Sequence, residues 1–367
     1  MKQKTNFNEK GITIIALIIT IILLLILVGV SINLVIKGNL FGSAEKAVDG
    51  TNAKAEQEQT RVDELMGKLN SMKDKEANDS IITEIENGES LIYTAEGGMA
   101  EAAKCLQEYR KTVVQIANSY SSLTDSDLES KKELLKQLAE ALDSIAREIM
   151  FNNEYLLDGS FNKNVGTSDY IVKIDDLSSE SLGLNKDEID NNLASAEAAN
   201  QYLTKIDQAI AKVSENRSRV GAASNGLEIL KDFYKEENSI LASNEANLDI
   251  KIARNGLIVI KDSLKRGIEL CNSATGTYID DSDRIYFKNE MDVLIKVIDI
   301  ISENCHYNEQ KLLDGTYGSI SKINSTSLGG GTKLGTDVST SEKAEALKIQ
   351  YQNAVNMVEN EIAKLGV

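Results

Sequence analysis

The chain has 367 residues, a net charge of −17, and neither proline nor tryptophan. This acidic balance argues against nucleic acid as a partner, because no basic stripe is present to neutralise phosphates. At ordinary usage a chain of this length would carry about 18 prolines. Since proline breaks helix interiors, its absence predicts long uninterrupted helices and an all-α fold.

The first predicted element is an apolar segment, residues 12–37. It is uncharged from Ile12 to Ile36, and Lys2, Lys4 and Lys10 precede it. At about 1.5 Å per residue it is long enough to cross the roughly 30 Å hydrocarbon layer as one helix. We therefore predict a single-pass transmembrane helix in contact with membrane lipid. Positive charge stays on the cytoplasmic side, which makes residues 1–11 a cytoplasmic basic leader and places the bulk of the chain outside the cell.

The order of residues at Gly11 and Ile12 resembles the leader of type IV prepilins, with the glycine before the apolar core. That resemblance implies cleavage between Gly11 and Ile12 by a prepilin-type peptidase. The fifth residue after such a cut is usually glutamate, and here it is Ala16. An uncleaved signal anchor and another export signal are the alternatives.

Residues 43–84 are predicted to form a helical stalk. Residues 38–42, Gly-Asn-Leu-Phe-Gly, read as a break, and Ser43 is a candidate N-cap. Residues 43–77 are rich in Ala, Glu, Lys and Gln, which is typical of a solvated helix.

Two copies of one pattern follow the stalk. Asp125-Ser126-Asp127 and Leu156-Leu157-Asp158-Gly159 recur 156 positions later, at Asp281-Ser282-Asp283 and Leu312-Leu313-Asp314-Gly315. A second spacing of 145 relates Val213 through Gly221 to Val358 through Gly366. These spacings predict a tandem duplication, with modules at 85–250 and 251–367.

Apolar residues at steps of three and four predict the helices of both modules. The predicted inward positions are Leu135, Leu138, Leu142, Ile145 and Ile149, and then Met291, Leu294, Ile298, Ile301 and Cys305. A coiled-coil-like seam follows at Ala199, Leu203, Ile206, Ile210, Val213, Val220 and Leu227, and again at Ala344, Tyr351, Val355, Val358, Ile362 and Leu365. Between these helices we predict minor β elements, with a short strand pair in Thr167 to Asp175, and a loop at 325–336 that contains three glycines.

The sequence offers little for catalysis or for metal binding. Cys305 occupies an isoleucine position and is predicted to be a small buried hydrophobe. His306 is the only histidine, whereas zinc needs about four ligands. The acids at 125, 127, 280, 281 and 283 are interpreted as helix caps and dipole partners, with a weak calcium site at the second cluster as the alternative. We predict no cofactor, no metal and no enzymatic activity.

Several linked motifs of residues 85–250 resemble bacterial flagellin. Thr94-Ala95-Glu96-Gly97, the run from Leu106 to Gln115, and Ala117-Asn118 are similar to its amino-terminal helical segment. Arg217 through Ala222 and Asn225-Gly226-Leu227-Glu228 are similar to its carboxy-terminal helical segment. The resemblance implies two long antiparallel helices in a self-assembling filament. It also implies subunit or helix contacts at Arg110, Gln115, Asn118, Asn152, Leu156, Leu157, Asp158, Gly159, Arg217, Arg219 and Gly221.

The expected protein is therefore a non-enzymatic structural subunit, or an accessory component, of a cell-surface filament. Its expected partners are itself or related filament subunits. Flagellins are soluble exported chains, so the apolar amino-terminal segment of this chain departs from their pattern. The alternative is a membrane-anchored extracellular adhesin or interaction module that does not polymerise.

Overall fold

The structure is a computed structural model that describes residues 44–167, 170–243, 246–276 and 278–366. The predicted leader with Gly11 and Ile12, the predicted transmembrane helix and the Ser43 cap lie outside these residues. Within the described ranges, no helix is long and apolar enough to cross a membrane. The chain divides between Lys73 and Asp74 into two units, and the second unit holds both predicted modules.

Helix α2 runs from Ala44 to Ser119, 76 residues without a break. Most side chains from 54 to 70 are exposed, as predicted for a solvated helix. The helix continues through residue 84, however, so the predicted boundary between stalk and first module falls inside a single helix. From Ile85 onward its buried residues recur in heptads: Ile85, Ile92, Met99, Leu106 and Val113, with Ala95, Ala102, Tyr109 and Ile116 between them.

The segment after α2 turns back along the bundle in short elements. It contains η1 (Tyr120–Ser122), α3 (Asp125–Glu148), β1 (Met150–Phe151), β2 (Glu154–Tyr155), β3 (Asn162–Asn164), β4 (Ile171–Lys173), η2 (Lys186–Glu188) and α4 (Ile189–Asn192). β1 pairs with β2 and β3 with β4, both antiparallel. The strand predicted within 167–175 is present as β4, but its partner is 162–164. The prediction of a pair contained in Thr167 to Asp175 was wrong, because the partner strand Asn162-Lys163-Asn164 is polar and exposed and gives no strand signal.

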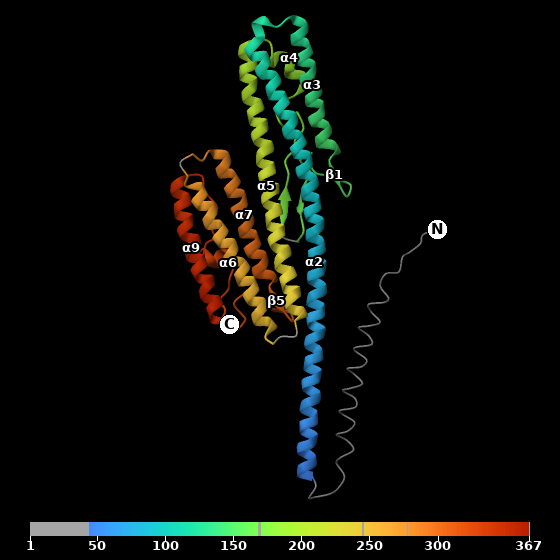
Figure 1. The fold of residues 1–367 in the computed structure, drawn as a ribbon, viewed down its shortest axis with the longest axis vertical. Coiled ribbons are helices and arrows are strands. Elements are labelled where there is room, and N and C mark those ends of the chain that lie inside the picture. Colours follow the sequence, from blue (N-terminus) through green and yellow to red (C-terminus); the bar gives the residue numbers. More distant parts are fainter. Residues whose placement is uncertain (1–43, 168–169, 244–245, 277, 367) are drawn as a thin grey trace, which may run out of the picture. The chain divides into compact units, whose positions relative to one another are not determined.

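Helix α5 (Ala196–Ala242) returns beside α2 (Figure 1). Ser195 caps it by accepting a hydrogen bond from the Ala198 backbone N–H. Its predicted seam faces the core: Ala199, Ile206, Val213, Val220 and Leu227 are buried, and Leu203 and Ile210 are half-buried.

The rest of the second unit is a smaller helical bundle. It comprises α6 (Leu248–Ala274), α7 (Asp281–Asn304), β5 (His306–Tyr307), β6 (Gln310–Lys311), α8 (Ser325–Leu328) and α9 (Ser341–Lys364). α6 lies between α7 and α9, and both α6 and α7 pack against α5 (Figure 1). The three glycines from 329 follow α8 in a turn where Gly330 and Gly331 have positive φ.

The two halves of the unit share several local features. α3 and α7 are each 24 residues long and begin with a capping box, Thr124 with Asp127 and Asp280 with Asp283. The acids at these helix starts therefore cap and complement the helix dipole, as predicted. The backbone hydrogen bond from Leu156 N–H to the Ile149 carbonyl recurs as Leu312 N–H to the Cys305 carbonyl. Cys305 is fully buried, as predicted for a residue in an isoleucine position.

Candidate functional site: the paired helices α2 and α5

Ion pairs join α2 to α5 along their length. Lys231 contacts Glu89 at 2.5 Å, Arg217 contacts Glu96 at 2.6 Å, and Arg110 contacts Asp207 at 2.7 Å. Residue numbers rise on one helix as they fall on the other, so the helices are antiparallel. Arg110 and Arg217 thus make contacts between helices of one chain, one of the two roles that the resemblance implies for them.

A buried tyrosine pair joins the same helices. The hydroxyls of Tyr109 and Tyr202 are 2.6 Å apart, and both side chains are almost fully buried. Burial raises the pKa of Tyr202 to about 12, and it raises the pKa of Tyr109 further. Both phenols therefore stay protonated, and their hydrogen bond fixes the register of the two helices.

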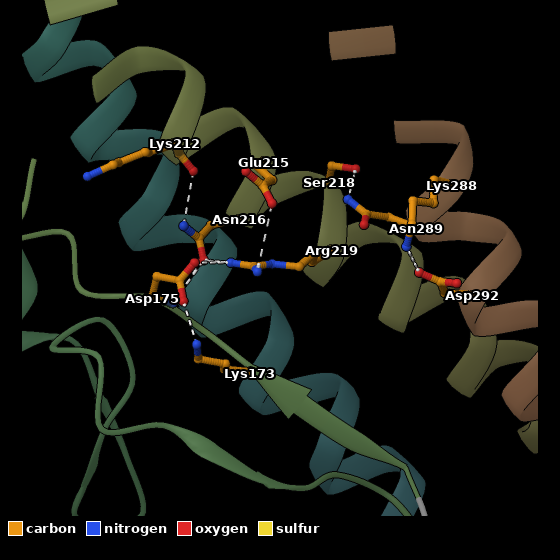
Figure 2. A network of polar contacts seen from close by, with 10 residues as sticks. All are labelled: Lys173, Asp175, Lys212, Glu215, Asn216, Ser218, Arg219, Lys288, Asn289 and Asp292. Atoms are coloured by element: carbon orange, nitrogen blue, oxygen red, sulfur yellow. Dashed lines mark hydrogen bonds and ion pairs between the residues drawn. The ribbon is translucent and has the colours of Figure 1, made fainter. Parts of the chain in front are cut away.

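Arg219 anchors the loop after β4 to α5 (Figure 2). Its guanidinium pairs with Asp175 and donates to Asn216 Oδ1 at 2.7 Å, while Asn216 Oδ1 also accepts from the Asp175 backbone N–H. Partial burial raises the pKa of Asp175, but hydrogen bonds from Arg219 and Lys173 outweigh it and hold that pKa below its ordinary value. The Arg219 guanidinium thus makes its contacts with residues of the same chain.

The candidate residues of the Leu-Leu-Asp-Gly turn stabilise the turn itself and its packing within the chain. Leu156 and Leu157 are fully buried, and the Asp158 carboxylate accepts from the Ser160 N–H at 2.9 Å. Gly159 has φ +81°, a conformation that favours glycine. Asn152 is exposed in the β1–β2 turn with φ 48°.

Three candidates lie at the surface of the pair. Gln115 accepts a hydrogen bond from Lys131 at 2.8 Å, while Asn118 and Gly221 are exposed. Gly221 lines an open groove of about 460 Å³, together with Tyr93, Glu96, Arg217 and Tyr286. Tyr93 is 67% exposed in this groove, and sequence reasoning missed it. The heptad spacing of α2 would have placed it off the buried seam.

The described residues contain no group of three or more side chains suited to hold a metal ion. The His306 imidazole Nδ1 lies 2.5 Å from the Asn304 carbonyl oxygen. All three cysteines are free, and burial raises the pKa of Cys105 and of Cys271 to about 11. These thiols lack the thiolate character that reactive cysteines need.

The sequence model of the bacterial flagellin N-terminal helical region matches residues 65–162. Over this range the chain is similar to the bacterial flagellins. The matched range covers the part of α2 that pairs with α5, all of α3 and the β1–β2 hairpin.

Curated relatives are similar to larger parts of the chain. Flagellin of Bacillus subtilis (strain 168) is 27% identical over 206 residues, covering 46% of this chain and 67% of that protein. Flagellin of Clostridium tyrobutyricum is 25% identical over 317 residues, covering 83% of this chain and 71% of the relative. The flagellar filament 30.7 kDa core protein of Treponema maltophilum is 30% identical, and 56% of it is covered. The chain thus spans between about half and three quarters of these relatives.

Proposed function

We propose that this protein is a non-enzymatic structural subunit of a cell-surface filament. The observation that carries the proposal is that its flagellin-like residues form the long antiparallel pair α2–α5 with an exposed face. Flagellin relatives include proteins named as flagellar filament core proteins. The α2–α5 pair is held together within the chain by its buried seam and by ion pairs. Such a preorganised surface suits assembly, because little conformational entropy is lost when it binds a neighbouring subunit.

We further propose that the subunit is a duplicated flagellin-like module tethered by its apolar segment. The shared helix lengths, capping boxes and turns of α3 and α7 support a duplication. The uncharged run from Ile12 to Ile36 supports a transmembrane or filament-core helix, and the layout at Gly11 supports processing by a prepilin-type peptidase. In this arrangement the described helices lie outside the cell.

Among the candidate contact residues, the exposed ones are proposed to face neighbouring subunits. Gln115, Asn118 and Gly221 are each exposed, and Arg217 and Tyr93 line the groove beside Gly221. Arg110, Arg219, Leu156 and Leu157 are proposed to act within the subunit, by holding its elements together.

The test is recovery of the full chain from membranes and, separately, from sheared surface material, with intact mass and electron microscopy of both. Fibres that contain the chain support a filament subunit, and a mass that begins at Ile12 supports leader processing. A chain found only in membranes, as a monomer or small oligomer, would overturn the filament proposal and favour a tethered interaction module.

A matched pair of variants tests the exposed face. Gly221→Glu adds a charged side chain to the groove wall, and we expect it to abolish fibres while the helical content is unchanged. Gly67→Glu is the control, since Gly67 is also a helical glycine with open space where a Cβ would lie. Fibre formation by both variants would rule out the α2–α5 face as the assembly surface.

A further inference from the structure

The turn between β5 and β6 is joined to α2 by Asp74, the first residue of the second unit. The Asp74 carboxylate Oδ2 accepts a hydrogen bond from the Asn308 backbone N–H at 3.1 Å, and its Oδ1 lies 4.0 Å from His306 Nε2. The Asp74 side chain is only 13% exposed. A turn of the second predicted module is therefore held against the long helix α2.

The contact between His306 and Asp74 depends on the protonation of the imidazole ring. His306 Nδ1 lies 2.5 Å from the Asn304 carbonyl oxygen, which can only accept, so Nδ1 carries a proton. In the neutral ring Nε2 is then unprotonated and has no proton to donate to the Asp74 carboxylate. In the imidazolium both nitrogens donate, and the ring brings a positive charge to that carboxylate.

A second titratable group lies next to Asp74. Glu237 of α5 is buried, and its Oε1 has no hydrogen-bond partner within the described residues. The titratable groups that interact with it are Asp74 of α2, Tyr234 of α5 and Cys305 after α7. Burial, and then the Asp74 charge, raise the pKa of Glu237 to about 8. A charged Glu237 therefore adds a second carboxylate beside Asp74, with one oxygen that has no donor.

We propose that Asp74, His306 and Glu237 form a pH-sensitive latch, in which protons on His306 and Glu237 hold the β5–β6 turn on α2. Histidine ordinarily gains or loses its charge between pH 5 and 8. As pH rises, His306 loses the positive charge that pairs with Asp74, and Glu237 gains a negative charge that repels it. Both changes disfavour the closed turn, so the turn opens more readily at alkaline pH. Opening also lets water reach the Glu237 carboxylate.

The other charged groups on the neighbouring stretches of α2, α5, α6 and α7 form a constant background. They are Lys75 with Asp79 on α2, Glu236 on α5, Asp249 and Lys251 at the start of α6, Glu303 at the end of α7, Glu309 in the turn, and Lys311 opposite His306. Carboxylates and lysines ordinarily keep their charge between about pH 6 and 9. Burial is the main cause that raises the pKa of Tyr234, Cys305 and Tyr317, so these groups stay neutral. The charge at this junction therefore changes through His306 and Glu237.

The first copy contains a similar hairpin without the latch. At the spacing of 156, Met150 corresponds to His306 and Asn152 to Asn308. Both turns place an asparagine at positive φ. Methionine does not titrate, so the β1–β2 turn is an internal control with a similar backbone.

The experiment is hydrogen exchange of the full chain in detergent micelles, measured by mass spectrometry at several pH values from about 5.5 to 9, the range in which histidine and Glu237 titrate. Each exchange rate is divided by the intrinsic rate at that pH, which gives the opening of each turn. From the lowest to the highest pH, the β5–β6 turn should lose about fivefold in protection relative to the β1–β2 turn. Equal protection of the β5–β6 turn across the series, or an equal loss in both turns, would overturn the latch.

Substitutions separate the two protons. His306→Met installs the residue of the first copy and should remove the loss of protection at the lower end of the series, because the turn then lacks the imidazolium at every pH. Glu237→Gln keeps the side chain neutral and should remove the loss at the upper end. Glu76→Gln, at an exposed position of α2, is the control and should keep the wild-type profile. A combined His306→Met and Glu237→Gln variant that retained the wild-type profile would contradict the proposal.

Asp74→Asn tests whether the carboxylate is the partner of His306. Asparagine keeps an oxygen that accepts from the Asn308 N–H but removes the charge. In this background His306→Met should change the protection of the turn at acidic pH by less than about twofold, whereas in the wild-type background it should lower it about threefold or more. An equal effect in both backgrounds would show that His306 acts through packing alone and would overturn the latch. The protection of α5 in each variant shows whether the chain remains folded.

Discussion

Glu237 is a carboxyl group at the buried end of the α2–α5 pair. It is 2% exposed, its Oε2 accepts from Asn78 Nδ2 at 3.2 Å, and its Oε1 has no partner. Burial is the main cause that raises its pKa from 4.5 to about 8. The nearby Asp74 carboxylate adds to this, and the Asn78 hydrogen bond opposes it. The folded chain therefore holds this group protonated at neutral pH.

The raised pKa makes folding stability depend on pH in a defined direction. Between pH 4.5 and about 8 the unfolded chain releases the Glu237 proton while the folded chain keeps it, so the free energy of unfolding falls as pH rises. Glu237→Gln removes this loss. Relative to wild type, the variant should gain roughly 1 to 4 kcal/mol between pH 5 and pH 8, at about 1.4 kcal/mol per pKa unit. Denaturant unfolding at both pH values measures it, with the exposed Glu236→Gln as control. Parallel pH profiles for Glu237→Gln and wild type would contradict the prediction.

The ion pairs between α2 and α5 should differ in strength according to their exposure. The side chains of Lys231 and Glu89 are 19% and 13% exposed, whereas those of Arg217 and Glu96 are 42% and 37% exposed. Double-mutant cycles with Glu→Gln and Lys or Arg→Met should give about 1 kcal/mol or more for the first pair and about 0.5 kcal/mol or less for the second, because water screens exposed charges. Added salt should weaken the second coupling more. Equal coupling energies would show that burial does not control these contacts.

At the scale of elements, local patterns predicted the helices and their inward faces well. All five predicted positions of the second copy are buried. In the first copy Leu135 and Leu142 are buried, whereas Leu138, Ile145 and Ile149 are half-buried. The capping acids were also readable, because a cap depends on residues three positions apart. Long-range partners were not readable. Nothing in the sequence joins Arg217 to Glu96 or Arg110 to Asp207, since these contacts require the register of two helices about 100 residues apart.

Two glycines of α5 show why helix propensity alone does not predict stability. A Cβ at Gly226 would lie 2.3 Å from Tyr170 Oη and 2.5 Å from Val293 Cγ1, whereas a Cβ at Gly221 would meet nothing within 4 Å. Gly226→Ala should therefore destabilise the protein by about 1–3 kcal/mol through overpacking. Gly221→Ala should stabilise it by about 0.5–1 kcal/mol through helix propensity. Thermal or denaturant unfolding of both variants measures the two changes in stability. If both variants changed stability by the same amount, Tyr170 and Val293 would have to move aside at no cost.

At the scale of the whole molecule, α2 joins a solvated segment to a packed one without any break in the helix. From 54 to 70 no residue is buried, whereas from Ile85 to Ile116 a heptad seam is fully inside the core. Ser71 and Asn78 are already buried, so burial begins before the boundary predicted at residue 84, and the helix continues through it. Composition revealed the solvated part. The continuity of the helix agrees with the absence of proline, whereas the change in composition after the stalk suggested a boundary that the helix does not have.

That change in burial predicts two levels of stability within one helix. A solvated helix has only its own hydrogen bonds, and isolated helices are marginal in water, so amides from 54 to 70 should exchange rapidly with solvent deuterium. Amides from 85 to 116 open only when the core opens and should be protected by several orders of magnitude more. Hydrogen exchange measured by mass spectrometry on the full chain gives both values at once, with α5 as an internal reference for core protection. Uniform protection along α2 would contradict the prediction. If that protection persisted on dilution, the solvated segment would be stable by itself; if dilution removed it, a second copy must cover this segment when the protein assembles.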